Sequence, residues 1–445
     1  MASSPDKIGA TAVRGRVLTF LGDPAEVGDE ACHRYIEDGM VVMEAGRILA
    51  VDDAATVLKT TSKDLVIEHY ADCFILPGFI DTHIHFPQTQ VIASYGTQLL
   101  EWLEKYTFVE EARFADSDHA RAIADFFHAE LLRNGTTTAL AYGTVHGAAL
   151  DAFFASAQDH GMRMIAGKSM MNRNAPDNLR DDVDQAVAEC ERLIATWHGR
   201  GRLAYAVTPR FAITSTAAQL DACGALLAAH PDVYMQTHLS ENTDEVAEIK
   251  RLFPNARDYT DVYERAGLLG PRSVFGHCIH LSEAELQRLH DSRSIIAFCP
   301  TSNLFIGSGL FDLARARGAD RPVRLSLATD VGGGTSFSML RTVADAYKIL
   351  QLQGQSLSAW QAFYMMTLGN ARALSLEDKI GGLAEGREAD LIVLDPKATP
   401  ILRHRQERND GDLHGELFAL STLGDDRAVK ATYVAGVKRR GDDTP

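Results

Sequence analysis

The sequence predicts an α/β fold in which a (β/α)8 TIM barrel is joined to a small β-sandwich domain built from both chain ends. The chain of 445 residues is long enough for a barrel and an accessory domain. Short apolar segments alternate with helical patterns through its middle part, and strand patterns without intervening helices occupy both ends. We expect residues 1–75 and 381–445 to form the small domain and residues 76–380 to form the barrel.

Both ends of the chain carry short runs of alternating apolar and polar residues. Strand patterns occur in Ala12–Phe20 and Gly39–Val51 near the N-terminus, and in Ala389–Leu394 and Val429–Val437 near the C-terminus. Because either set alone would leave unpaired strand edges, we expect the two ends to build one domain together. The charged segment Arg403–Asp412 is expected to be a solvated loop.

The middle of the chain repeats a strand followed by a helix. Helical periodicity is clear in Ala120–Arg133 and Asp182–Trp197, for example. The expected strands lie near residues 79–85, 136–142, 162–169, 203–209, 233–239, 273–278, 294–299 and 324–330. Eight such units in series favour a closed parallel barrel. A doubly wound open sheet is the alternative, and the lack of a Gly-x-Gly-x-x-Gly motif after the first strand weakens it.

Composition narrows the possible partners and the compartment. The formal net charge of -16 disfavours nucleic acids and anionic membrane surfaces as partners. The six cysteines are scattered without a Cys-x-x-Cys pair, as expected for reduced thiols in the cytoplasm. The start of the chain, Met1–Lys7, lacks the basic and apolar regions of a secretory signal, and no apolar run approaches membrane-spanning length. We therefore expect a cytoplasmic protein.

The most informative motif is a pair of histidines at the end of the first expected barrel strand. His83 and His85 follow the apolar segment Leu76–Ile80. Side chains two residues apart on a strand point to the same face, so both imidazoles can approach one point. Two convergent imidazoles form half of a metal site. The alternative is a strand end that carries two exposed histidines.

Three more ionisable residues close later apolar runs. His238 ends the fifth expected strand, His277 the sixth and Asp330 the eighth. A barrel gathers these strand ends around one mouth, where catalytic residues of such folds lie. Three imidazoles and one carboxylate suit zinc or ferrous iron with a position left open for water, whose pKa then falls to about 7. Calcium is disfavoured because it prefers an all-oxygen ligand set.

Glu241 follows His238 by three residues, which places it just past the strand. A carboxylate there can reach a water molecule in the site and transfer its proton. The alternative is structural, because Ser240 and Glu241 could cap the helical segment Asp244–Leu252. We keep both interpretations, since one residue can serve both purposes.

Several longer blocks of sequence carry a resemblance to a known family. The segment Pro77–His85, with the later His, His and Asp, resembles the amidohydrolase superfamily of metal-dependent hydrolases over nearly the whole chain. Further blocks with this resemblance are His85–Gln88, Trp102–Phe108, Thr208–Phe211, His238–Asn242, Cys299–Leu304 and Asp330–Ser336. The resemblance implies the barrel with its split β domain, and it suggests a homodimer.

The same resemblance implies a specific metal site. One zinc ion per subunit, with ferrous iron as the alternative, would be bound by His83, His85, His238 and Asp330. His277 would then lie beside the activated water. Some members bind two metals through a lysine at the end of the fourth strand. This chain has Arg210 in the segment that closes that strand, without a lysine, and one metal is therefore expected.

The activity implied by the resemblance is hydrolytic deamination of a purine, converting guanine to xanthine and ammonia. Glu241 would carry a proton to a ring nitrogen, Asp330 would pass a proton from water to the leaving amine, and His277 would steady the tetrahedral oxygen. Substrate contacts are expected from Gln88, Arg210, Phe211, His238 and Glu241. Arginine supplies fixed donors to O6 and N7, glutamine can donate and accept, and phenylalanine offers a flat apolar surface.

Alternatives remain for the residues and for the function. Arg210 could form an ion pair, Gln88 could cap a loop and Phe211 could be plain core. The substrate could be another heterocycle, such as a pterin, an adenosine derivative or a chlorotriazine, or the protein could be a metal-free scaffold. Two residues depart from the family pattern: Val109 replaces a proline and Asn172 an aspartate, both in expected loops near the barrel mouth.

Overall fold

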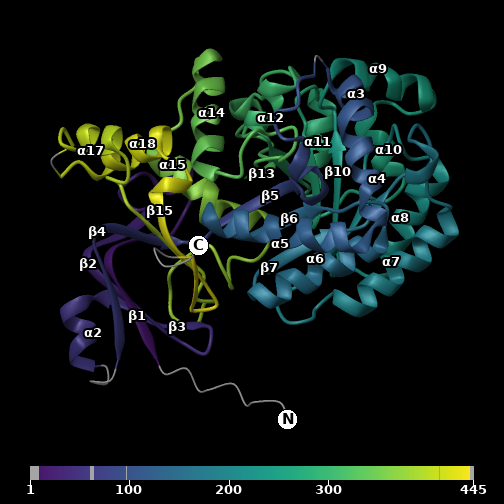
Figure 1. Ribbon diagram of the computed structural model, residues 1–445. Coiled ribbons are helices and arrows are strands. Elements are labelled where there is room, and N and C mark those ends of the chain that lie inside the picture. The colour runs from purple at the N-terminus through teal and green to yellow at the C-terminus, as the bar shows by residue number, and fades with distance from the viewer. Residues whose placement is uncertain (1–9, 61–64, 97, 410, 441–445) are drawn as a thin grey trace, which may run out of the picture.

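The computed structural model describes residues 10–60, 65–96, 98–409 and 411–440, and it contains a barrel and a separate sheet made by the chain ends (Figure 1). The predicted fold class is thereby confirmed. The segment Met1–Lys7, on which the expectation about a secretory signal rested, lies outside the described residues. Within the described ranges, no helix combines the length and the apolar character needed to cross a membrane.

All eight predicted barrel strands are present, and each is parallel to its neighbours. In order around the barrel they are β5 (Phe79–His85), β6 (Thr136–Tyr142), β7 (Arg163–Gly167), β9 (Ala204–Pro209), β10 (Tyr234–Leu239), β11 (Ser273–His277), β12 (Ile295–Phe298) and β13 (Arg324–Leu327). The two-residue strand β8 (Ser169–Met170) pairs with β9. The eighth strand ends at Leu327, so the expectation that it reaches Asp330 was wrong.

Specific hydrogen bonds close the barrel between β5 and the segment after β13. The Asp330 N–H donates to the His83 carbonyl at 2.9 Å, and the His85 N–H donates to the Val331 carbonyl at 2.8 Å. Below them, the Asn370 side-chain amide donates to the carbonyls of Ile80 and Leu327. These bonds satisfy backbone groups that a short last strand would leave unpaired, and they fix Asp330 beside the two histidines.

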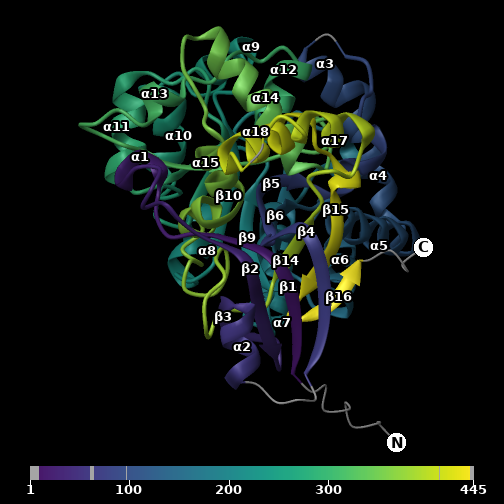
Figure 2. The same ribbon diagram turned by 90° about the vertical axis from the view of Figure 1, so that its left-hand side faces the viewer.

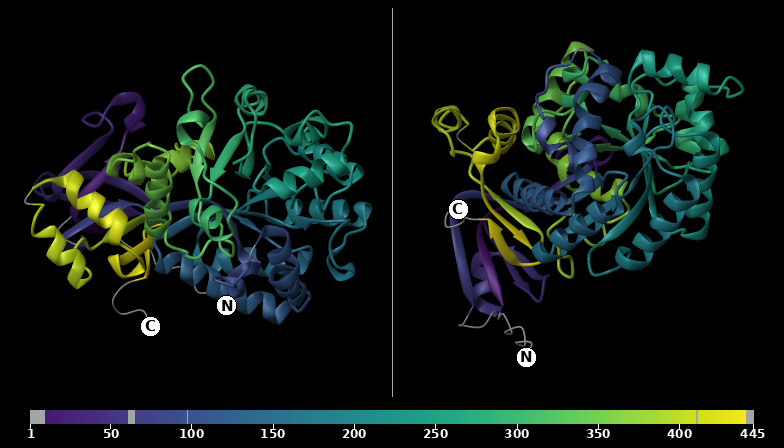
Figure 3. Two further views of the ribbon diagram at one scale, coloured as in Figure 1. Left: turned by 90° about the horizontal axis from the view of Figure 1, so that it is seen from above. Right: turned by 45° about the vertical axis from the view of Figure 1, so that its right-hand side comes forward.

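Helices surround the barrel (Figure 3). The predicted helices are confirmed as α5 (Ser117–Arg133) and α7 (Val183–Trp197), and the side chain of Asp182 caps α7. The other barrel helices are α3 (Leu99–Trp102), α4 (Phe108–Ala112), α6 (Gly147–His160), α8 (Ala217–Ala229), α9 (Thr243–Leu252), α10 (Tyr259–Arg265), α11 (Glu283–Asp291), α12 (Pro300–Phe305), α13 (Leu313–Ala316), α14 (Met339–Leu352), α15 (Ala359–Tyr364) and α16 (Asn370–Ala373).

The chain ends form one mixed sheet of seven strands (Figure 2). Its order is β16 (Val437–Arg440), β15 (Val429–Val434), β14 (Leu391–Leu394), β4 (Val66–Pro77), β1 (Thr11–Phe20), β2 (His33–Glu44) and β3 (Arg47–Asp53). Only the β1–β4 pair is parallel. The two chain ends thus build one β unit together, as expected. Its strands form a single sheet, whereas the expected sandwich would have two. The short helices α1 (Pro24–Val27) and α2 (Ala54–Thr60) accompany it.

Two expected strand segments are in fact tight hairpins. Ala435 and Gly436 have φ angles of 47° and 74°, and they divide Val429–Val437 into β15 and β16. Ala45 and Gly46, at 49° and 81°, divide Gly39–Val51 in the same way. Two-residue turns with both φ angles positive match the twist of the flanking strands.

The segment Arg403–Asp412 is only partly a loop, which corrects the expectation. Helix α17 (Pro400–Gln406) covers its first part, because Thr399 caps the helix and Pro400 suits its first position. After a short connection, α18 (Leu413–Leu423) follows and packs on α14 and α15.

A buried cluster of charges joins the sheet to the N-terminal ends of the barrel strands. Arg163 at the start of β7 and Arg202 before β9 both pair with Glu388, and Arg202 also pairs with Asp390. Further bonds complete the cluster: Arg202 donates to the Gly161 carbonyl at 2.8 Å, and Asp390 accepts the Ala435 N–H at 2.8 Å.

Candidate active site

Predicted site residues from β5, from β10 and from the segment after β13 meet at the C-terminal mouth of the barrel. Potential ligand atoms of His83, His85, His238 and Asp330 all lie within 4.8 Å of one another. The Asp330 Oδ1 atom lies 3.3 Å from His83 Nε2 and 3.2 Å from His85 Nε2. The Nε2 atoms of His85 and His238 are 3.2 Å apart. The structure therefore brings together the four side chains that the resemblance implied as ligands.

The donor set fits a metal ion on its own chemistry. His238 Nδ1 lies 2.7 Å from the Arg210 carbonyl, which only an N–H can bond, so the Nε2 lone pair faces the cluster. Among the described residues, neither ring nitrogen of the fully buried His83 has a hydrogen-bond partner. Buried polar atoms are normally paired, and facing lone pairs repel unless a cation lies between them. Three nitrogens and one carboxylate oxygen suit zinc or ferrous iron.

Burial keeps these imidazoles neutral, as metal ligands must be. It lowers the pKa of His85 to about 3 and that of His238 well below its usual range. Burial by itself would raise the pKa of Asp330, but the adjacent His83 and His85 rings hold that pKa well below its ordinary value of 3.8. The cluster thus combines neutral nitrogens with an ionised carboxylate.

Backbone conformation aims two of the side chains. His277 and Asp330 have φ angles of 68° and 50°, a region that residues other than glycine rarely adopt. Gly276 is required for a different reason: a Cβ atom there would lie 2.4 Å from His83 Cε1. The close approach of β11 to the His83 ring therefore depends on a glycine at this position.

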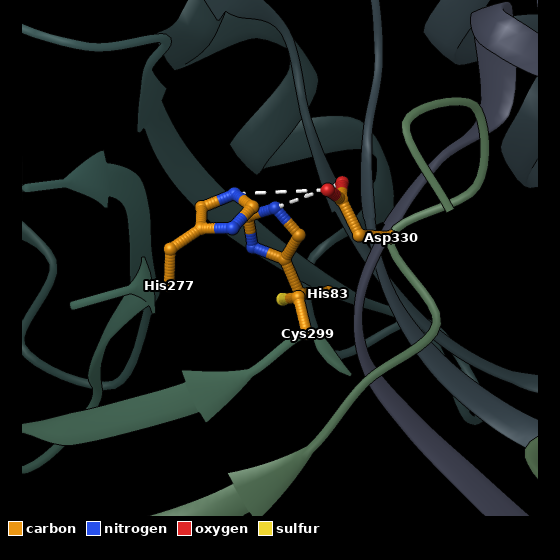
Figure 4. A group of neighbouring side chains, drawn as sticks. All are labelled: His83, His277, Cys299 and Asp330. Carbon is orange, nitrogen blue, oxygen red and sulfur yellow. Dashed lines mark ion pairs between the residues drawn. The ribbon is translucent and has the colours of Figure 1, made fainter. Parts of the chain in front are cut away.

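A second group of potential ligands overlaps the first. It contains His83, His277, Cys299 and Asp330, and Figure 4 shows both imidazoles facing the Asp330 carboxylate. Burial raises the pKa of the Cys299 thiol well above its usual value, and the thiol donates to the Ala297 carbonyl. Because metals bind the thiolate form, this group is the poorer ligand set.

Glu241 lies in the same cavity and is not a helix cap. The cap of α9 is Asn242, which forms a capping box with Glu245, so the structural alternative was wrong. The Glu241 carboxylate instead accepts a hydrogen bond from the Ser308 hydroxyl at 2.9 Å. Burial and then the nearby Asp330 charge raise the pKa of Glu241 from 4.5 to about 8. A carboxyl group with such a pKa can both give and take a proton near neutrality.

His277 lies between two carboxylates. Its Nε2 atom is 3.4 Å from Glu241 Oε2 and 3.6 Å from Asp330 Oδ2. On its other side, His277 Nδ1 lies 2.8 Å from Asn303 Oδ1, which orients the ring. Three groups able to handle protons thus converge on one point of the cavity.

All five predicted substrate contacts line this cavity: Gln88, Arg210, Phe211, His238 and Glu241. It holds about 360 Å³ of empty space, including its open mouth. Its walls are His85, Gln88, Leu99, Trp102, Leu103, Arg210, Phe211, His238, Glu241, His277, Ile306, Asp330 and Gly333. Arg210 also forms an ion pair with the buried Glu111. The structure therefore shows both the ion pair considered as an alternative for Arg210 and its predicted place in the cavity wall.

Sequence reasoning missed several residues that support the site. Glu111 and Ser308 come from a helix and a loop without a distinctive motif, and nothing in their local sequence singles them out. Asn303 lies in the block Cys299–Leu304 that carries the resemblance, but no role was assigned to it. Tyr142 could have been found, because it ends the second barrel strand; its ring stacks on His85 with centroids 4.4 Å apart.

The two departures from the family pattern lie outside the cavity walls. Val109 is exposed on α4, so the expectation that it lies in a loop was wrong. Asn172 follows β8 and exchanges hydrogen bonds with Thr216. Neither residue is among those that line the cavity.

Comparisons with known proteins agree with this geometry. A model of the amidohydrolase family matches residues 74–438. The chain is 46% identical over 428 residues to the guanine deaminase of Escherichia coli strain K12, with 96% of each chain covered. A solved structure of E. coli guanine deaminase matches with a TM-score of 0.94 at 45% identity, covering 97% of this chain and 100% of that one.

A more distant solved structure carries a ligand. It is the crystal structure of guanine deaminase from C. acetobutylicum with bound guanine in the active site. It matches with a TM-score of 0.85 at 26% identity and covers 97% of this chain and 100% of that chain. The similarity therefore extends over the barrel and the end-built sheet alike.

Proposed function

The chain belongs to the amidohydrolase family, and we propose that within this family it hydrolyses guanine to xanthine and ammonia. The observation that carries the proposal is a single cavity that is lined by three of the four proposed ligands and by Gln88, Arg210 and Phe211; the three ligands are His85, His238 and Asp330. The names of the relatives over the full chain length point to the same reaction.

The metal proposed for this site is one zinc ion per subunit. His83, His85, His238 and Asp330 would hold it. Its chemical contribution would be to lower the pKa of a water molecule in the cavity to about 7, so that hydroxide is available at neutral pH. Arg210 closes the strand that bears a lysine in two-metal relatives, which supports one ion rather than two.

Proton transfers in the reaction fall to three side chains. Water adds to C2 of guanine, forming a C–O bond, and the C2 amino group leaves as ammonia. Asp330 accepts a proton from the attacking water and helps to return it to the departing amine. Glu241, whose pKa is raised to about 8, carries a proton to the ring nitrogen next to C2. His277, oriented by Asn303, would steady the developing oxyanion.

Guanine would lie against Phe211 with its polar edge toward Gln88 and Arg210. Phe211 lines the cavity, where it is nearly buried, and its ring centroid is 6.3 Å from that of His238. The flat ring supports a purine, and the polar groups orient it. His238 and Glu241 complete the contacts near the reacting carbon.

The direct test is guanine turnover with and without metal. We expect the purified protein to contain about one zinc per chain, to lose activity after chelation and to regain it when zinc is added back. Ultraviolet absorbance distinguishes guanine from xanthine, and elemental analysis identifies the metal. Turnover that survives complete removal of metal would reject the metal proposal, and absence of guanine turnover by the loaded protein would reject the reaction. Adding ferrous iron in parallel tests the alternative metal.

Other expectations from the sequence stay proposals at this stage. We propose a cytoplasmic homodimer with the domain boundaries given above. Sedimentation equilibrium tests the subunit number, and limited proteolysis tests the boundaries.

A further inference from the structure

Glu111 is a buried carboxylate that contacts two of the proposed substrate-binding side chains at once. It lies on α4 with no exposed surface. The Arg210 Nη1 group donates to Glu111 Oε1 at 2.7 Å and to Oε2 at 2.8 Å. The Gln88 Nε2 group donates to Glu111 Oε1 at 3.1 Å. Glu111 therefore lies behind both residues.

An ionised carboxylate can only accept hydrogen bonds. Gln88 must therefore turn its NH2 group toward Glu111, and its carbonyl oxygen Oε1 is left as the group available to a ligand. Among the described residues, no donor reaches Gln88 Oε1, and Gln88 lines the cavity. Residue type alone suggests that the Gln88 amide can either donate to a ligand or accept from it. The contact with Glu111 leaves Gln88 only the role of acceptor.

Contacts with Glu111 and Phe108 also fix the Arg210 side chain, which presents hydrogen-bond donors where Gln88 presents an acceptor. Glu111 occupies its Nη1 group, and the Phe108 ring lies 5.6 Å from the guanidinium carbon. Within the described parts of the chain, the Nε and Nη2 groups of Arg210 meet no acceptor, and Arg210 lines the same cavity. The cavity thus offers one fixed acceptor beside several fixed donors.

We propose that Glu111 is a positioning residue that sets the purine specificity of the site by fixing the acceptor of Gln88 and the donors of Arg210. The inference rests on the proposed guanine deamination and deepens it. Guanine presents acceptors at O6 and N7 and a donor at N1, which matches this pattern. A 2,6-diaminopurine carries the same C2 amino group but has a donor at C6 and an acceptor at N1, which opposes it.

The test compares these two substrates in the full-length, zinc-loaded protein. In the Glu111→Gln variant, the new amide can accept from or donate to Gln88, which can then present either end to the substrate. We expect kcat/KM for guanine to fall about 10–100-fold, mainly through KM, and the preference for guanine over 2,6-diaminopurine to fall about tenfold or more. Equal losses for both substrates, with an unchanged preference, would overturn the inference.

Two conservative variants serve as controls. Glu111→Asp keeps a group that only accepts, so the preference should stay within about threefold of that of the wild type even if kcat/KM drops. If Glu111→Asp loses the preference as Glu111→Gln does, the acceptor character of Glu111 is not the cause. Glu110→Gln changes the neighbouring carboxylate, which pairs with Arg113 and His119 and does not line the cavity, and should leave both activities unchanged.

A further variant keeps the test decisive if Glu111→Gln fails to fold. Gln88→Leu removes the oriented amide and leaves the Glu111–Arg210 ion pair intact. We expect the same loss of preference, about tenfold or more, and an unchanged preference would overturn the inference. The wild type separates this inference from the proposed function. If it turns over neither purine, the proposed function fails, whereas guanine turnover with an unaltered preference in the variants defeats only the role of Glu111.

Discussion

Two clusters of buried charged side chains lie at opposite ends of the barrel strands, and they differ in how their polar groups are satisfied. At the N-terminal ends, Arg163 and Arg202 pair with Glu388 and Asp390. At the C-terminal ends, the ligand cluster around His83 leaves buried ring nitrogens without hydrogen-bond partners in the described chain. One cluster is complete in the protein alone, and the other needs a further positive charge.

This contrast separates stability from function within one fold. A buried ion pair with all its hydrogen bonds made holds two parts of the chain together, and breaking it leaves an uncompensated charge. A cluster of facing lone pairs, kept in place by left-handed backbone at His277 and Asp330, is retained for what it binds. The division agrees with the general rule that the C-terminal face of such barrels carries chemistry and the N-terminal face carries stability.

The largest expected effect is at the C-terminal cluster. Asp330→Asn removes the only carboxylate of the four-ligand set and the proton acceptor for water. We expect kcat/KM for guanine to fall about a thousandfold or more, with zinc content reduced. Steady-state kinetics and elemental analysis measure both. Activity within tenfold of that of the wild type would contradict a functional role for this cluster.

A change in the charged cluster at the N-terminal ends of the strands should lower stability and leave catalysis intact. Glu388→Ala takes from the buried Arg163 its ion-pair partner and leaves Arg202 with Asp390 alone, and we expect it to destabilise the fold by about 3–5 kcal/mol. Urea denaturation of the metal-free protein measures this. The folded fraction should retain the kcat/KM of the wild type, since Glu388 does not line the cavity. A large loss of kcat/KM without loss of stability would contradict the assignment.

The stability difference between the wild type and Glu388→Ala should also depend on pH. Although burial raises the pKa of Glu388, the two arginines outweigh it and hold the pKa below 4.5. A depressed carboxyl pKa contributes stability above the unfolded-state pKa, and this is lost as the pH falls through the folded-state value. The stability difference between wild type and Glu388→Ala should therefore shrink below about pH 4.5.

The proton carrier should affect turnover and leave metal binding unchanged. Glu241→Gln keeps the size of the side chain and its contact with Ser308 but cannot transfer a proton. We expect kcat to fall about a hundredfold or more with zinc still bound. Stopped-time assays of xanthine formation, normalised to zinc content, measure this. Near-normal turnover with a full complement of zinc would reject the role of Glu241.

The smallest effect is expected where an ion pair is exposed. Asp38 pairs with Arg14 on the end-built sheet, and about half of its side-chain surface is exposed to solvent. We expect Asp38→Ala to change the free energy of unfolding by less than about 1 kcal/mol and to leave activity unaltered. It is the matched control for Glu388→Ala in the same urea titrations. An equal loss in both variants would show that burial of the pair is not what matters.

Much of the fold and part of the site could be predicted from local patterns. The spacing of His83 and His85 places both side chains on one strand face, and the apolar runs before His238 and His277 mark strand ends. The two hairpins were missed because Ala45 and Ala435 occupy left-handed positions that alanine rarely adopts. No local pattern announces such a turn.

Glu111 shows where prediction stops. It is one of several acidic residues in Glu101–Glu111, and only its packing against Arg210 and Gln88 distinguishes it from Glu110, which pairs with the exposed Arg113. The same holds for Asn303, whose importance lies in its contact with His277.

The order of apolar runs and their terminal polar residues predicted the barrel, the mouth at which chemistry takes place and a group of candidate ligands that included His277. These features follow from the two-residue periodicity of strands and from chain connectivity, which are written locally along the chain. The family resemblance then separated His277 from the four expected ligands. Tertiary structure alone decided which end of the Gln88 amide faces a ligand, which carboxylate lies behind Arg210 and how the His277 ring is held. These features depend on contacts between segments far apart in the chain. In a buried network an unpaired polar atom is costly, so each donor or acceptor restricts the orientation of its neighbours.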